Sequence, residues 1–118
     1  MRAFIFGLMA ALGVAGAAQA QSVGGTYSVS GKNFNGSAYG GTAQIAPSGA
    51  ACRITWQTGS TTSAGICMLS GKSFAAAYKL GDEIGLVVYE LQPDGRLIGV
   101  WTIADKAGAG SETLTPRR

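Results

Sequence analysis

Residues 51–67 read ACRITWQTGSTTSAGIC, and this stretch decides the fold. Ahead of the Gly59-Ser60 dipeptide, apolar and polar side chains alternate, which is the period of a β-strand with one buried face. The apolar side chains of this strand are Cys52, Ile54 and Trp56, and the polar ones are Arg53, Thr55 and Gln57. A two-residue turn at Gly59-Ser60 brings Cys52 opposite Cys67. The stretch therefore predicts a β-hairpin with a disulfide on its inner face.

Turn signals of the same kind recur every ten to fourteen residues on both sides of this hairpin. They are Asn35-Gly36, Ser48-Gly49, Ser70-Gly71, Gly81-Asp82, Asp94-Gly95 and a glycine-rich stretch around Gly108. This spacing suits consecutive antiparallel strands and leaves no room for crossover helices. About eight strands are expected, near 25–31, 37–46, 50–58, 61–69, 73–79, 83–91, 96–104 and 109–115.

An antiparallel meander of about eight strands is best closed into a small up-and-down barrel, because closure removes the exposed sheet edges. A two-sheet β-sandwich is the alternative architecture. The three consecutive alanines between Phe74 and Leu80 leave a short helix open for that segment.

A second hairpin is predicted around Gln92-Pro93-Asp94-Gly95-Arg96. Because Pro93 has no N–H to donate, a type I turn with Gly95 in the left-handed region fits best. The resulting register places Tyr89 opposite Gly99, where the tyrosine ring is expected to cover the glycine backbone.

The outer face of this second hairpin is also apolar, and it carries Leu86, Val88, Ile98 and Val100. Two explanations are open. The strand pair is covered by another layer or by a terminal segment, or the face is a surface for a partner or for a second copy of the chain.

Residues 1–20 have the pattern of a secretory signal peptide, with Arg2 at the start, an apolar run to Val14 and small residues at Ala18 and Ala20. Cleavage there leaves residues 21–118 as a single domain. We expect export to the periplasm or the medium, where a disulfide is the default state of two cysteines. No later segment is apolar over the length that a membrane-spanning helix needs, so no membrane insertion is expected.

Charge and composition argue against several functions. The chain has nine Lys and Arg, six Asp and Glu and no histidine. The basic residues are spread singly, without the basic stripe that nucleic acid binding requires. Without histidine or further soft ligands, no metal, cofactor or catalytic triad is expected, and the protein is predicted not to be an enzyme. The acidic residues fall mostly in or beside turns and are expected to be solvated: Asp82, Glu83, Glu90, Asp94, Asp105 and Glu112.

Binding is the class of function that remains. The candidate ligand-binding residues are Trp56, Tyr78, Tyr89 and Trp101, which can line the mouth of a barrel. The same residues also suit a filled core, since eight strands leave little interior space. The prediction is an exported, non-catalytic binding module for an unknown small molecule or protein, with a homodimer left open. The alternative is an interaction or inhibitor protein that docks on a host or bacterial protein through loops and the outer apolar face.

Several segments together resemble a family of small exported bacterial proteins of unknown function, some of which carry a fibronectin-binding label. The segments are Gly25-Thr26-Tyr27-Ser28-Val29, Asn35-Gly36-Ser37-Ala38-Tyr39-Gly40-Gly41-Thr42, Arg53-Ile54-Thr55-Trp56, Val87-Val88-Tyr89, Gly99-Val100-Trp101-Thr102 and Glu112-Thr113-Leu114-Thr115-Pro116. The resemblance covers nearly all of residues 21–118 and implies an exported β-barrel. The two cysteines are not part of the pattern.

Overall fold

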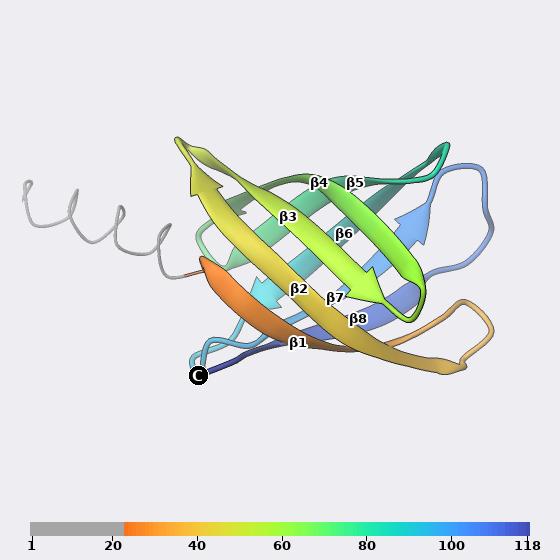
Figure 1. The fold of residues 1–118 in the computed structure, drawn as a ribbon, viewed down its shortest axis with the longest axis horizontal. Helices are drawn as coiled ribbons and strands as arrows, with labels where there is room; N and C mark the ends of the chain where they lie inside the picture. Colours follow the sequence, from red (N-terminus) through yellow and green to blue (C-terminus); the bar gives the residue numbers. More distant parts are fainter. Residues whose placement is uncertain (1–22) are drawn as a thin grey trace, which may run out of the picture.

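The computed structural model describes residues 23–118, which form a closed barrel of eight antiparallel strands in sequence order (Figure 1). The strands are β1 (Gly25–Lys32), β2 (Ala38–Ser48), β3 (Ala51–Thr58), β4 (Thr61–Ser70), β5 (Ser73–Leu80), β6 (Glu83–Leu91), β7 (Leu97–Ile103) and β8 (Gly110–Pro116). Each strand pairs with its neighbours, and β8 pairs with β1. The up-and-down barrel is therefore confirmed. The sandwich and the helix at Phe74–Leu80 are wrong.

The predicted signal peptide, residues 1–20, lies outside the described residues. Within residues 23–118, no helix is long and apolar enough to cross a membrane.

Both predicted hairpin registers are confirmed. Cys52 lies opposite Cys67 and forms a disulfide with it, with the two Cα atoms 4.9 Å apart. Tyr89 lies opposite Gly99. In the turn between β6 and β7, the Gly95 N–H donates to the Gln92 carbonyl at 2.9 Å, and Gly95 has a φ of 91°. Turn chemistry and the two-residue period were sufficient to determine both registers.

The core fills one half of the barrel. Its largest fully buried side chains are Ile54, Phe74, Val87, Tyr89, Leu97 and Leu114. The disulfide belongs to the same cluster, since Cys52 and Cys67 are both buried. The loops β2–β3, β4–β5 and β6–β7 lie at this end, which is on the left in Figure 1.

Three inward-facing glycines mark places where neighbouring strands come very close. They are Gly41, Gly65 and Gly99. A Cβ at Gly65 would lie 1.8 Å from the Ala77 carbonyl oxygen, so no larger residue fits without moving the backbone. Glycines at such positions let strands bend, as a narrow barrel requires.

The expected role of Gly99 is therefore corrected. The atoms nearest a Cβ at this position are the Val88 carbonyl oxygen, at 2.1 Å, and the Tyr89 Cα, at 2.8 Å, and not the Tyr89 ring. The glycine accommodates a bend in the strands and not a covering ring.

The outer apolar face is exposed, so the explanation that another layer or a terminal segment buries it is wrong for the described residues. Leu86, Val88, Ile98 and Val100 keep between 39% and 59% of their surface accessible. Ile66, Met68 and Ile84 extend the exposed apolar surface over β4 and β6.

We expect replacement of both cysteines by alanine to lower the free energy of unfolding by about 3 kcal/mol, because the disulfide closes a loop that spans 15 residues. Urea denaturation of the oxidised chain and the double variant measures the difference. A difference below about 1 kcal/mol would contradict a stabilising role for the bridge.

Candidate ligand-binding site

The half of the barrel opposite the disulfide is built from aromatic rings that lie against glycines. A Cβ at Gly31 would fall 2.3 Å from the Tyr39 ring, one at Gly85 2.1 Å from the Tyr78 ring, and one at Gly110 2.2 Å from the Trp101 ring. Each ring therefore occupies the space that a side chain on the adjacent strand would take. The rings are held against the barrel wall, and the middle of the barrel is left open.

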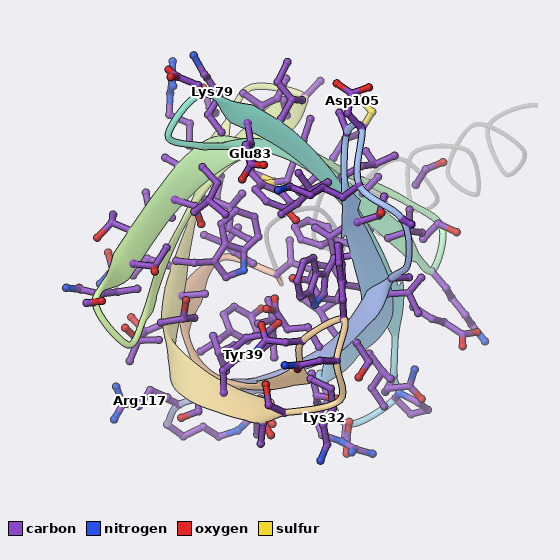
Figure 2. All side chains as sticks on the ribbon, turned by 90° about the vertical axis from the view of Figure 1, so that its right-hand side faces the viewer. Lys32, Tyr39, Lys79, Glu83, Asp105 and Arg117 are labelled. Carbon is purple, nitrogen blue, oxygen red and sulfur yellow. A yellow bond between two sulfur atoms is a disulfide. The ribbon has the colours of Figure 1, made fainter. Side chains whose placement is uncertain are left out.

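The open space is a cavity of about 360 Å³. Its aromatic lining is Tyr39, Trp56, Tyr78 and Trp101, and its aliphatic lining is Leu80, Val87 and Ile103. The polar lining is Asn33, Thr58, Thr61, Ser63 and Glu112. Figure 2 looks into this end of the barrel, with Tyr39 inside the ring of strands. The loops β1–β2, β3–β4, β5–β6 and β7–β8 surround the mouth.

Glu112 is the only buried charged residue of residues 23–118, with 7% of its surface exposed. Its Oε1 accepts a hydrogen bond from the Tyr39 hydroxyl at 2.7 Å. Its Oε2 accepts one from the Trp56 Nε1 at 2.9 Å and another from the Tyr89 hydroxyl. All three donors are neutral groups. The carboxylate is thus satisfied by hydrogen bonds and not by an opposite charge.

The sequence-based expectation that Glu112 is solvated near a turn is wrong. Glu112 lies on β8 between Gly110 and Leu114, and these three side-chain positions point inward and are buried. The sequence did contain a signal for the buried position of Glu112. Leu114 is an apolar residue two positions further along the strand, and a two-residue period places both side chains on the inner face.

The tyrosines of this site are held in the neutral form. Burial raises the pKa of Tyr39, Tyr78 and Tyr89, and the negative charge of Glu112 raises each of them further. The pKa of Tyr78 rises to about 12. Neutral hydroxyls remain available as donors, so the hydrogen bonds to Glu112 persist across the physiological pH range.

The structure brings three of the four predicted aromatic residues to the cavity. Trp56, Tyr78 and Trp101 line it, and the Trp56 and Tyr78 ring centroids are 5.2 Å apart. Tyr89 is separate from them: it is 1% exposed, packs on Phe74 and donates to Glu112 from the core side.

Two loops meet over Trp101 at the mouth. Phe34, from the β1–β2 loop, stacks on the Trp101 ring with centroids 4.9 Å apart. Gly108, from the β7–β8 loop, lies against the same phenylalanine, and a Cβ there would be 3.7 Å from its ring. Phe34 and its loop therefore cover one side of the entrance.

No family model and no curated protein matches the chain. Solved structures that share the fold include a de novo designed fluorescence-activating β-barrel, which has a TM-score of 0.67 and 15% identity and covers 83% of this chain and 96% of its own. A redesigned barrel, mFAP1, bound to DFHBI has a TM-score of 0.70 and 19% identity over 80% of this chain and 95% of its own. A fatty acid transporter, REP1-NXSQ, has a TM-score of 0.56 and 14% identity over 84% and 98%. At these identities the likeness concerns the fold.

We expect all four tyrosines of the folded chain to ionise above their ordinary pKa of 10, because Tyr27 is also raised by burial. The unfolded chain ionises near pH 10. Unfolding therefore releases protons above that pH, so the tyrosine contribution to stability is fully present below about pH 10 and is lost as the pH rises toward 12. Absorbance at 295 nm, with and without concentrated urea, measures both titrations. A tyrosine that titrates at pH 10 in the folded chain would contradict this description of the site.

Proposed function

We propose that the chain is a non-catalytic binding protein that takes up a small, largely apolar molecule through the open end of its barrel. The observation that carries this proposal is the cavity of about 360 Å³, walled by four aromatic rings with a single buried carboxylate at its side. Its volume falls within the range of small-molecule pockets, and its lining combines seven aromatic or aliphatic residues with five polar ones.

The walls of the cavity are held in place by hydrogen bonds within the protein. The Tyr78 hydroxyl donates to the Thr102 carbonyl at 3.2 Å, and the Trp101 Nε1 donates to the Ser111 carbonyl at 3.3 Å. With Tyr39 and Trp56 bonded to Glu112, each of the four rings has a fixed polar end. Rings that are already ordered lose little entropy on binding, which favours affinity.

The residues of the cavity support binding and not catalysis. Glu112 is the only carboxylate in the lining, so a hydrolysis that needs a pair of carboxylates has no second acid there. The chain contains no histidine to act as a general base. The serine and threonine hydroxyls of the lining therefore lack an activating partner.

Proteins of the same fold support this assignment. The redesigned barrel mFAP1 is bound to DFHBI, and the transporter is named for fatty acids. A barrel of this size can therefore hold a small molecule in its interior. The disulfide in the core supports export to an oxidising compartment, either the periplasm or the medium, as the place where binding occurs.

A neutral fluorescent probe, N-phenyl-1-naphthylamine, tests whether the cavity binds. The only two tryptophans of the chain, Trp56 and Trp101, both line the cavity, so tryptophan quenching reports binding there. We expect Ser63→Phe, which fills the cavity, to weaken binding by at least about tenfold, or about 1.4 kcal/mol. The control Thr62→Phe changes the next residue, which is exposed, and should bind like the unmodified chain. Equal binding by the two variants would contradict the proposal.

A second candidate function, self-association, is favoured by the exposed apolar face. Among the outward-facing strand residues of this face, the charged ones are Lys79, beside the β5–β6 turn, and Glu90, at the far end of β6. Two copies can pack these faces together about a two-fold axis that lies in the interface and runs at right angles to the strands. The Lys79 end of one copy then meets the Glu90 end of the other. The face is thus complementary to itself in both polarity and charge.

We expect the chain to sediment as a dimer, and Val100→Asp to raise the dimer dissociation constant by at least about tenfold, because it places an unpaired charge in an apolar contact. Thr55→Asp, on the exposed polar face of β3, serves as the control and should leave the dimer intact. A monomer at all concentrations, measured by analytical ultracentrifugation, would rule out self-association and leave the face to another partner.

A further inference from the structure

We propose that the ligand of this cavity is an organic cation, a protonated amine on an apolar or aromatic body, with Glu112 as its counter-ion. This inference rests on the proposed binding function and specifies the chemical class of the ligand. Four observations lead to it: the unpaired charge of Glu112, its remaining acceptor capacity, the aromatic walls, and the absence of positive charge in the lining.

The charge of Glu112 has no opposite partner among the residues that the structure describes. The two ion pairs of residues 23–118 are Arg96–Asp94 and Lys106–Glu83, and both lie at the surface. Burial of an ionised carboxylate is costly unless a charge or a full set of hydrogen bonds compensates it. A cation that enters the cavity supplies the missing charge.

Glu112 also keeps room for one more donor. An ionised carboxylate offers about four acceptor positions. Three are occupied, two on Oε2 by Trp56 and Tyr89 and one on Oε1 by Tyr39. The remaining position is on Oε1. Because Glu112 itself lines the cavity, an ammonium N–H of a bound ligand can occupy this position.

The other walls favour a cation as well. The faces of tryptophan and tyrosine rings attract positive charge, and Trp56, Tyr78, Trp101 and Tyr39 surround the cavity. The cavity lining contains no lysine or arginine, so no positive charge there attracts an anion or repels a cation. A carboxylate ligand, such as a fatty acid, would face the negative charge of Glu112 in a site of low polarity.

The rim adds little selectivity of its own. Lys32, Lys79, Glu83 and Asp105 stand around the mouth in Figure 2, so both signs of charge are present. Selection by charge is therefore expected to come from inside the cavity.

Three ligands that share a phenyl ring on a short alkyl chain test the inference with the unmodified chain: 2-phenylethylammonium, 2-phenylethanol and 3-phenylpropanoate. Binding is measured by tryptophan fluorescence and by isothermal titration calorimetry. We expect the ammonium compound to bind at least about tenfold more tightly than the alcohol, and the carboxylate most weakly.

The outcomes separate this inference from the proposed function. An alcohol or a carboxylate that binds as tightly as the amine would overturn the cationic class while the cavity remains a binding site. The same holds if N-phenyl-1-naphthylamine binds and the amine does not. If neither the probe nor any of the three ligands binds, both proposals fail.

A variant pair then tests the role of Glu112. Glu112→Gln removes the charge and keeps the size, and we expect the preference for the amine over the alcohol to shrink to within about twofold. Asp105→Asn, at the rim and in neither ion pair, is the matched control and should retain the preference. Circular dichroism establishes that each variant is folded. A folded Glu112→Gln variant that still prefers the amine would overturn the assignment of Glu112 as the counter-ion. The comparison of the three ligands on the unmodified chain tests the cationic class independently of any variant.

Discussion

The carboxylate of Glu112 is the point on which the interior depends. It extends from β8, the strand that closes the barrel against β1, and it accepts hydrogen bonds from Tyr39 on β2, Trp56 on β3 and Tyr89 on β6. Four strands on different sides of the barrel are thus connected through one side chain. Because a carboxylate only accepts, all three partners must donate, and this requirement fixes the orientation of each ring. The buried charge that organises the core is also the charge that a ligand meets.

The barrel is divided at Glu112 into a packed half and an open half. On the core side, Tyr89, Phe74, Leu97 and Leu114 fill the interior together with the buried disulfide. On the mouth side, glycines replace the side chains that would fill the space, and rings such as Tyr78 over Gly85 lie against the wall. Small residues allow a narrow eight-stranded barrel to keep a cavity. Stability and binding therefore reside in different halves of the barrel, and Glu112 contributes to both.

The fold could be predicted from the sequence because turn chemistry and strand period act locally. Gly59-Ser60 and the Pro93–Gly95 turn determined the registers of two hairpins, and one of them located the disulfide. The role of Glu112 was missed because β7 and β8 are joined by a longer glycine-rich loop that sets no register, so the alternation with Leu114 was the one signal that its side chain points inward. The bend at Gly99 was missed because it depends on barrel closure. The cavity itself depends on which side chains from eight strands meet at one level, which local patterns do not reveal.

The central claim is that the ionised side chain of Glu112 organises this interior, and its most direct test is the stability of Glu112→Gln. The amide keeps only one accepting oxygen, so at least one of the three donors loses the acceptor that the carboxylate provides. The account predicts that urea denaturation gives a free energy of unfolding lower by about 1–3 kcal/mol. Asp82→Asn, in the exposed β5–β6 turn, should change it by less than about 0.5 kcal/mol. Equal stability of the two variants would contradict the account.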